Sequence, residues 1–302
     1  MSSSPLVTVI VVNFNFEAYV RATLESVKDL AYDNMELIVI DDCSRDQSVD
    51  LIRQWLSTCR IPSRLVLNER NLGVCATLNK AFAMANGKYI SATAGDDILM
   101  PEKLLHQVPL LEAAGPDVCA VYSDAYLIRE DGSAREKNFI ATRNVQGIPQ
   151  GNIFPFLLTD NFIPAMSVLL RTDCFHAVGG FDEKLVYEDY DLWLRMAKQY
   201  RFLYSGYISV KYRIKEKSHS TSIEWDIPNT RVLLKHIHDH PMVLEKLQEI
   251  ALKAYRKGSE KVMGILSAGS VEDRYIRRLL WLHRYKVPAG IGQRLLPTRS
   301  GS

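Results

Sequence analysis

Two adjacent carboxylates, Asp96 and Asp97, end a β-type run in the stretch ISATAGDDILMPEKLL, residues 90–105. Because like charges repel each other, this pair requires either a solvated turn or a bound cation. Divalent cations take oxygen ligands, and in enzymes one or two carboxylates commonly share the ion with substrate phosphates. A capping role for the helix that begins with Pro101 is less well supported, since both carboxylates lie four or more positions before it. The pair therefore predicts a divalent cation site.

Two further polar clusters follow β-type runs. Residues 13–15, Asn-Phe-Asn, come after the run 7–12, and the pair Asp41 and Asp42 stands at the end of the run 36–41. The carboxyl ends of parallel strands meet at one edge of a sheet, and open α/β sheets bind their ligands there. We therefore expect these two clusters and the later carboxylate pair to line a single crevice.

Spacing alone leaves two roles open for Asp41 and Asp42. Ser44 and Gln47 form a capping box for the next helix, so that helix does not need either carboxylate as a cap. The two carboxylates then either interact with the positive end of the helix dipole or accept a hydrogen bond from a base N–H in the crevice.

The elements that must position these residues are strands and helices in alternation. Strands are expected at 7–12, 36–41, 64–68 and 88–93. Helices are expected at 17–30, after a turn within 43–56, at 73–87 and at 101–115, the last one kinked or split at Pro109. Such alternation predicts parallel βαβ units, and hence an α/β protein with helices flanking a mostly parallel sheet.

The pattern changes after Val118. A strand pair is expected around the Asp131-Gly132 turn, and further strands within 167–171 and 207–214. A helix is expected over 188–200, and its apolar stripe consists of Leu192, Met196 and Tyr200. We predict one domain over residues 1–222, with halves at 1–117 and 118–222, followed by a helical extension over 223–302.

The predicted extension is strongly basic. Residues 251–302 hold 11 Lys and Arg against 3 Asp and Glu, a net charge of +8, whereas the whole chain has +2. In RYIRRLLWLHRY, apolar and basic residues alternate; they are Ile276, Leu279, Leu280 and Trp281, with Arg274, Arg277, Arg278 and Arg284. We expect this tail to dock on an anionic membrane surface, or else to pack on the acidic remainder of the chain.

Several protein classes are disfavoured. Neither G-x-G-x-x-G nor G-x-x-x-x-G-K-[ST] occurs, which argues against a dinucleotide-binding Rossmann domain and a P-loop. The five cysteines are dispersed without a C-x-x-C pair, as expected for a reduced, cytoplasmic protein without structural zinc. No apolar run approaches the length of a membrane span, and no signal peptide or nucleic-acid partner is expected.

A resemblance to a known family rests on five motifs in order along the chain. They are VTVIVVNFN, ELIVIDDCSRDQS, NERNLGVCATLNKAFAMANGKYI, AGDDILMPEKL and VGGFDEKLVYEDYDLWLRM. Together, over roughly residues 5–220, they resemble family 2 of the nucleotide-sugar glycosyltransferases. The resemblance implies the GT-A fold, a Rossmann-like mixed and mostly parallel sheet flanked by helices. It also implies transfer of a sugar from a nucleotide-diphosphate sugar to an acceptor hydroxyl.

The resemblance also implies site residues. The nucleotide-binding set is Asn13, Phe14, Asn15, Asp42, Asn71, Asn79 and Asp96, with Asp42 on the base and Asp96 on the ribose. The ligands of a divalent cation, Mn²⁺ or Mg²⁺, are Asp96 and Asp97, together with His219 from a His-Ser pair. An ordinary loop histidine is the equally weighted alternative for His219. The catalytic base is Asp189, with Glu188 before it.

The sequence departs from the family at two site positions. Leu78 stands where many members have Arg, and Ala94 stands where many have a further Asp. The missing Arg removes a nucleotide contact and leaves the identity of the base open, although a UDP-sugar is the expected donor. The Gln-x-x-Arg-Trp signature of processive members is absent, so one sugar is added per event.

One carboxylate base implies direct displacement with inversion at the anomeric carbon, because double displacement needs a second carboxylate as nucleophile. The expected acceptor is a glycan or a lipid-linked glycan in bacterial surface polysaccharide assembly, reached from the cytoplasm or from the inner face of the membrane. The rival functions are a catalytically silent nucleotide-sugar-binding module and a nucleotidyltransferase. The latter normally has a Gly-rich phosphate loop, which NFNFEAY lacks.

Overall fold

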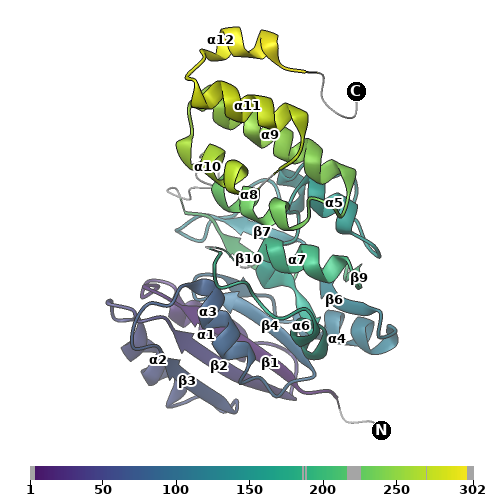
Figure 1. Ribbon diagram of the computed structural model, residues 1–302. Coiled ribbons are helices and arrows are strands. Elements are labelled where there is room, and N and C mark those ends of the chain that lie inside the picture. The colour runs from purple at the N-terminus through teal and green to yellow at the C-terminus, as the bar shows by residue number, and fades with distance from the viewer. Residues whose placement is uncertain (1–3, 186, 188, 216–225, 270, 298–302) are drawn as a thin grey trace. The chain divides into compact units, whose positions relative to one another are not determined.

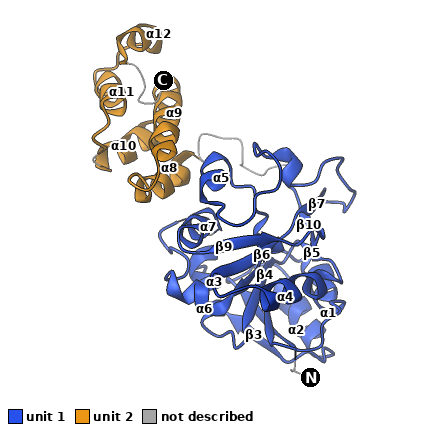
Figure 2. Cartoon of the chain, turned by 90° about the vertical axis from the view of Figure 1, so that its right-hand side faces the viewer, with its two compact units in different colours: residues 1–216 blue, residues 217–302 orange. Residues whose placement is uncertain are grey.

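The computed structural model describes residues 4–185, 187, 189–215, 226–269 and 271–297. The chain forms two compact units, residues 1–216 and 217–302 (Figure 2). The predicted boundary between residues 222 and 223 falls within 216–225, outside the described residues, and it stays a prediction.

A seven-stranded sheet forms the centre of the first unit, in the order β3-β2-β1-β4-β8-β6-β9. All neighbours are parallel except that β8 runs antiparallel to β4 and to β6. The strands are β1 (Val7–Asn13), β2 (Met35–Asp41), β3 (Ser63–Leu67), β4 (Tyr89–Ala94), β6 (Val118–Tyr122), β8 (Leu169–Arg171) and β9 (Arg201–Tyr204). Every residue of β2 is buried, as its run of apolar and β-branched side chains predicts.

Helices cover both faces of this sheet. The crossovers through α1 (Val20–Lys28) and α2 (Ser48–Leu56) run in one direction along the sheet, whereas the crossover through α3 (Val74–Phe82) runs in the other. Because such crossovers are right-handed, α1 and α2 lie on one face and α3 lies on the opposite face (Figure 2). The four predicted strands and four predicted helices of this half are all present. Each strand begins and ends within one residue of its predicted bounds, whereas the helices are shorter than predicted.

A second, three-stranded sheet has the order β5-β10-β7. Its strands are β5 (Ile98–Leu99), β7 (Ala125–Ile128) and β10 (Val210–Arg213). All three are labelled in Figure 2, and β7 and β10 also in Figure 1. β5 follows directly after the predicted cation ligands, and its antiparallel partner β10 comes from the far end of the unit. This small sheet thereby brings the residues around 213 to the carboxylate pair.

Short helices complete the unit. They are α4 (Lys103–Ala113), α5 (Phe154–Thr159), α6 (Thr172–Ala177), α7 (Asp189–Ala197), η1 (Ile140–Thr142) and η2 (Ala165–Ser167). On α7, Leu192 and Met196 are fully buried, which confirms most of the predicted apolar stripe. Asp191 and Arg195 form the expected ion pair at 2.8 Å.

The predictions for α4 and α2 had different outcomes. Helix α4 runs through Pro109 without being split. A kink at this proline stays a prediction. The predicted capping box does not form, because α2 begins only at Ser48. The hydroxyl of Ser44 bonds instead to the Asp41 carboxylate at 2.6 Å.

The second unit is a helical bundle. Its helices are α8 (Asp226–Lys235), α9 (Pro241–Lys257), α10 (Glu260–Ala268), α11 (Arg274–Arg284) and α12 (Ala289–Gly292), followed by η4 (Gln293–Leu295). Gly258 ends α9 in the left-handed conformation, and the Asp273 carboxylate caps α11 through the Ile276 N–H at 2.8 Å. None of the described helices is long and apolar enough to cross a bilayer.

Candidate active site

The three predicted polar clusters meet at one edge of the main sheet. Asn13, the last residue of β1, lies opposite Asp41, the last residue of β2, and Val12 lies opposite Ala94 at the end of β4. The Asn13 amide donates to the Asp41 carboxylate at 2.7 Å. This register fixes the carboxyl ends of three parallel strands side by side, as expected for a ligand-binding crevice.

A cavity of about 380 Å³ opens at this edge. That volume lies within the usual range of ligand pockets. Its polar or aromatic lining includes Phe14, Asp42, Asn71, Asp97, Asp189 and Trp193. Five of these six were predicted site residues, and they come from loops separated widely in the sequence. The cavity is therefore lined both by residues predicted to bind the nucleotide and by Asp189, the residue predicted to act as the catalytic base.

Asp42 shapes the loop on one side of this cavity. Its carboxylate accepts hydrogen bonds from the Leu72 N–H at 2.8 Å, the Gly73 N–H at 2.9 Å and the Asn68 amide at 2.9 Å. Gly73 has φ +82°, a backbone conformation that residues other than glycine rarely adopt. Asp42 thus holds the loop that carries Asn71 against the cavity, and its oxygens keep capacity for a further donor.

Three predicted nucleotide-binding residues use their side chains to hold loops and do not line the cavity. Asn13 is fully buried beside Asp41, and Asn15 accepts from the Arg45 N–H at 2.8 Å. The Asn79 amide bonds to both backbone groups of Phe181 at 2.9 Å and to the Glu183 carboxylate. Any contact of these three residues with a nucleotide stays a prediction.

Asp97 is almost fully buried and carries an unsatisfied oxygen. Its Oδ1 accepts from the Arg213 N–H at 2.9 Å, whereas its Oδ2 has no hydrogen-bond partner among the described residues. Burial, and secondly the charge of Asp96, raises the pKa of Asp97 well above its usual value. A buried acceptor without a partner requires an explanation, and a cation would supply one.

Asp96 already contacts a cation of the chain itself. The Lys215 ammonium lies 2.9 Å from Asp96 Oδ2 and 4.1 Å from the centroid of the Phe16 ring. Among the described residues, no group of three His, Cys, Asp or Glu side chains is placed to hold a metal ion. His219 lies outside the described residues. The donor set of Asp96 and Asp97 fits a Mg²⁺- or Mn²⁺-type site whose other ligands are phosphate oxygens and water.

Asp189 begins α7 and is half-buried at the cavity wall. The Asn161 amide donates to its Oδ2 at 2.9 Å, and the Tyr190 N–H donates to its Oδ1 at 2.7 Å. Burial raises the pKa of Asp189, while these two hydrogen bonds and the charge of Arg143 act in the opposite direction. Glu188 lies outside the described residues, so its predicted contribution is still a prediction.

The sequence analysis missed four residues around this site: Asn161, Trp193, Lys215 and Arg213. Trp193 lies one helical turn beyond Asp189 and lines the same cavity, and its buried Nε1 has no hydrogen-bond partner among the described residues. Its spacing of four residues from the predicted base was a usable signal. The other three reach the site through loops or pairings that no sequence pattern indicated.

Known proteins share this sequence pattern and fold. The model of the family described as glycosyl transferase family 2 matches residues 8–175. An uncharacterized glycosyltransferase of Rickettsia felis is 28% identical over 222 residues, which cover 72% of this chain and 36% of that protein. An Escherichia coli protein named UDP-Glc:alpha-D-GlcNAc-diphosphoundecaprenol beta-1,3-glucosyltransferase WfaP is 27% identical over 220 residues, 72% of this chain and 80% of its own.

Solved structures confirm the predicted fold. S. aureus TarS, in complex with UDP-GlcNAc, superposes with a TM-score of 0.64 at 18% identity, covering 93% of this chain and 87% of TarS. The Pyrobaculum calidifontis mannosyltransferase PcManGT, in complex with GDP-Man and Mn²⁺, has a TM-score of 0.56 at 17% identity, covering 96% of this chain and 87% of that one. At these identities the likeness establishes the fold alone.

Proposed function

The chain belongs to glycosyl transferase family 2, and on this premise we propose that it transfers one sugar from a nucleotide-diphosphate sugar to an acceptor hydroxyl with inversion. The observation that carries the proposal is that Asp97 and Asp189 line one cavity at the carboxyl ends of the parallel strands. One oxygen of Asp97 has no hydrogen-bond partner among the described residues, and the pKa of Asp189 is raised by burial. A site for diphosphate charge and a site for proton abstraction are the two requirements of this reaction.

The nucleotide is assigned to the side of the cavity formed by Phe14, Asp42 and Asn71. Phe14 is 41% exposed, so its ring is available to stack on a base. TarS was solved with UDP-GlcNAc and PcManGT with GDP-Man, which supports a nucleotide-sugar donor without selecting the base. We propose a UDP-sugar, following the resemblance at Asp42.

Asp96 and Asp97 would hold a divalent cation against the diphosphate. Asp97 Oδ2, which has no partner within the described part of the chain, and the carboxylate of Asp96 are hard oxygen donors of the kind that Mn²⁺ and Mg²⁺ take. The Mn²⁺ in PcManGT supports the choice of ion. Such an ion neutralises the charge that develops on the leaving diphosphate.

Asp189 is assigned the role of general base. One of its oxygens takes the proton of the acceptor hydroxyl, whose oxygen forms a bond to the anomeric carbon. The bond from that carbon to the diphosphate oxygen breaks, and its electron pair leaves on the nucleoside diphosphate. The raised pKa of Asp189 suits proton abstraction, and the hydrogen bond from Asn161 fixes the orientation of the carboxylate.

Asn161→Ala is expected to shift the acidic limb of the pH–rate profile to higher pH, by about one unit. The Asn161 hydrogen bond lowers the pKa of Asp189, so its loss raises that pKa further and leaves the base protonated over a wider acidic range. Nucleotide-sugar hydrolysis followed from pH 5 to 9 measures the shift. Asn144→Ala, an exposed asparagine on a neighbouring loop, is the control. An unchanged acidic limb in Asn161→Ala would show that Asn161 does not act through Asp189.

The acceptor is proposed to be a glycan or a lipid-linked glycan in surface polysaccharide assembly. The support is the name of the E. coli relative, which describes a sugar-diphosphoundecaprenol acceptor. A lipid-linked acceptor lies at a membrane surface, and the second unit carries a face that fits such a surface.

That face lies on α11. Tyr275, Ile276, Leu279 and Leu282 are buried in the bundle, so these side chains are not available to contact a membrane. The opposite stripe leaves Trp281 exposed by 44% and Tyr285 by 61%, with their ring centroids 4.9 Å apart. The Arg278 guanidinium lies 4.4 Å from the Trp281 ring centroid, and Arg274, Arg277 and Arg284 near the two rings in sequence are exposed. Aromatic rings beside basic groups are typical of proteins at a lipid–water interface.

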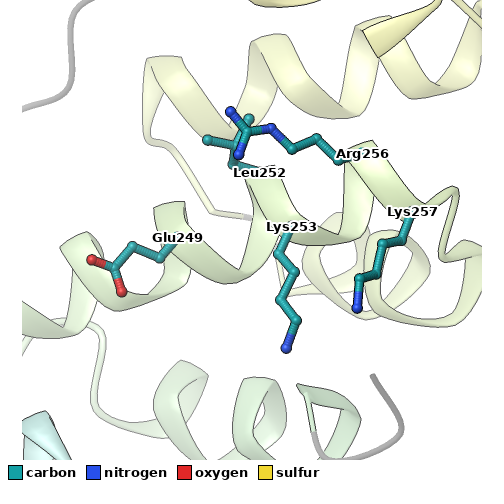
Figure 3. Close-up of a pocket in the computed structure, with 5 residues that line it drawn as sticks. All are labelled: Glu249, Leu252, Lys253, Arg256 and Lys257. Carbon is teal, nitrogen blue, oxygen red and sulfur yellow. The ribbon is translucent and has the colours of Figure 1, made fainter. Parts of the chain in front are cut away.

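A second group of basic side chains lies on α9. Lys253, Arg256 and Lys257 line a shallow hollow together with Leu252 and the acidic Glu249 (Figure 3). Lys253 is paired with Asp226 at 2.7 Å, which leaves Arg256 and Lys257 as the more available charges. These charges add to the attraction of the second unit for an anionic surface.

The double variant Arg277→Gln/Arg284→Gln is expected to weaken binding to phosphatidylglycerol vesicles by about 30-fold, since each charge near the surface contributes about 1 kcal/mol. Co-sedimentation with these vesicles and with neutral phosphatidylcholine vesicles measures the effect. The control is Arg135→Gln/Lys137→Gln, the same charge change on exposed residues of the first unit. Equal sedimentation of the two double variants would refute the membrane role of α11.

Thermal melting against UDP, GDP, dTDP and CMP, each with Mn²⁺, tests the proposed donor class. A family 2 transferase that uses a UDP-sugar should be stabilised most by UDP, because ligands that bind only the folded state raise its stability. Stabilisation by none of the four nucleotides would contradict the proposed function.

A further inference from the structure

The ammonium of Lys215 lies beside the carboxylate pair of Asp96 and Asp97, where a positive charge offsets the repulsion between the two carboxylates. This ammonium is 2.9 Å from Asp96 Oδ2, 4.1 Å from the Phe16 ring centroid and 5.9 Å from that of Tyr19. The Lys215 side chain is 38% exposed, whereas that of Asp96 is 11% exposed. Phe16 and Asp97 line the cavity, so Lys215 contacts one residue of its wall and the neighbour of another.

The backbone that delivers Lys215 is firmly held. The Arg213 N–H donates to Asp97 Oδ1, and Arg213 Nε donates to the Asp96 carbonyl, both at 2.9 Å. The guanidinium of Arg213 also lies 4.5 Å from the Tyr19 ring centroid and bonds to the carbonyls of Arg129 and Glu130. Lys215, two residues further on, is therefore brought to Asp96 by a fixed strand end, while its flexible stem lets the ammonium move alone.

A lysine ammonium and a divalent cation cannot share Asp96 without repelling each other. Two positive charges on one carboxylate lie only a few ångströms apart, and the low exposure of Asp96 weakens the screening by water. Binding of the ion that Asp96 and Asp97 would hold therefore requires the ammonium to leave Asp96. An ammonium released from Asp96 stays close to the place assigned to the diphosphate, and lysine binds phosphate as a point charge.

We propose that Lys215 is a built-in counter-ion of Asp96 that a divalent cation displaces, and that the released ammonium then binds the diphosphate of the nucleotide sugar. This inference rests on the proposed function of the same site. It assigns to Lys215 two successive partners, the Asp96 carboxylate in the metal-free protein and the diphosphate in the loaded one.

The test compares the wild type with Lys215→Met in two binding measurements on the full chain. Without nucleotide, Mn²⁺ is titrated and the free ion is followed by electron paramagnetic resonance. Lys215→Met should bind Mn²⁺ about three- to tenfold more tightly, because no ammonium competes for Asp96. With saturating Mn²⁺, calorimetry of UDP binding should show an affinity about tenfold lower in Lys215→Met, because one phosphate contact is lost. The two effects have opposite signs, which a general loss of folding would not produce.

Lys88→Met provides the matched control. Lys88 forms a similar pair with Glu112 at 2.7 Å and lies 5.4 Å from the Tyr89 ring centroid, and neither residue lines the cavity. The Lys88→Met variant should leave the Mn²⁺ and UDP affinities unchanged. The Lys215→Arg variant keeps the positive charge and should show the wild-type affinities for both. If Lys215→Met binds Mn²⁺ no more tightly than the wild type does, the inference is overturned. If the proteins still bind UDP normally in that case, the proposed function stays intact. Absence of Mn²⁺ and UDP binding in every variant overturns both.

Discussion

Replacing Asp189 with asparagine is expected to lower the rate of sugar transfer by about 10²–10⁴-fold, the usual cost of losing a general base. Asparagine has nearly the same shape, and its amide oxygen can still accept the hydrogen bond from the Tyr190 N–H. It cannot take the proton of the attacking hydroxyl. Because Asp97 and the nucleotide side of the cavity are unchanged, UDP binding with Mn²⁺ should stay close to that of the wild type. Initial rates of nucleotide release and calorimetric UDP affinities measure the two quantities.

A matched control for this variant is Asp173→Asn. Asp173 is also an aspartate in the first turn of a helix of the first unit, but it is exposed and does not line the cavity. Its variant should keep wild-type rates. If Asp189→Asn retained most activity while Glu188→Gln lost it, the base would be the preceding residue. Asp191 is not a good candidate for the base, because it is buried in its ion pair with Arg195.

The double variant Asp96→Asn/Asp97→Asn is expected to remove the effect of Mn²⁺ on UDP affinity. In the wild type the ion should raise that affinity by at least about tenfold, equivalent to about 1.4 kcal/mol. Neutral amides are poor ligands for a divalent cation and do not offset the charge of the diphosphate. Calorimetric titration of UDP with and without Mn²⁺ gives both affinities for both proteins.

The loss in this double variant should not be a loss of folding. The raised folded-state pKa of Asp97 means that its ionised form costs stability, and this cost appears as pH rises above the pKa of the unfolded chain. At neutral pH a neutral asparagine avoids that cost and keeps an oxygen for the Arg213 N–H. Melting temperatures should therefore be similar. A double variant that still binds UDP more tightly with Mn²⁺ would rule out the carboxylate pair as the metal site.

Local sequence patterns predicted the first half of the fold and the cavity edge well. The strands that end at Asn13, Asp41 and Ala94 are short buried runs with helices between them, and this alternation permits little besides a parallel sheet. Once the sheet is parallel, its carboxyl ends share an edge, so Asp42 and Asp97 had to come together. The capping box at Ser44 failed because α2 begins only at Ser48, and the Ser44 hydroxyl oxygen accepts instead from the Asn15 N–H at 2.9 Å.

The residues missed at the site depend on contacts between distant parts of the chain. Arg213 meets Asp97 across 116 positions, and the pairing of β10 with β5 that makes this possible involves only two residues of β5. Asn161 lies in a loop without hydrophobic periodicity, 28 positions before the carboxylate that it contacts. Hydrophobic periodicity contains no information about such pairings, so neither Lys215 nor Asn161 could be placed beside a carboxylate in advance.

The basic helix α11 shows the same limit of prediction from sequence. The sequence of α11 showed arginines and apolar residues together, but it did not show which apolar residues would be buried. Packing within the bundle buries Ile276 and Leu279 and leaves Trp281 and Tyr285 at the surface. The membrane hypothesis therefore now rests on two aromatic rings and their flanking arginines, and no longer on the whole apolar stripe.

Proton NMR of nucleotide-sugar hydrolysis is the most direct test of the central claim. The wild-type protein is incubated with Mn²⁺ and each member of a panel of UDP-, GDP- and dTDP-sugars, and the free sugar is observed before its anomers equilibrate. The account predicts that one donor class is consumed, that the first sugar released has the anomeric configuration opposite to the donor, and that Asp189→Asn releases almost none. Release with the donor's own configuration would contradict direct displacement with Asp189 as base. Consumption of no donor by a protein that binds UDP would instead identify a silent binding module.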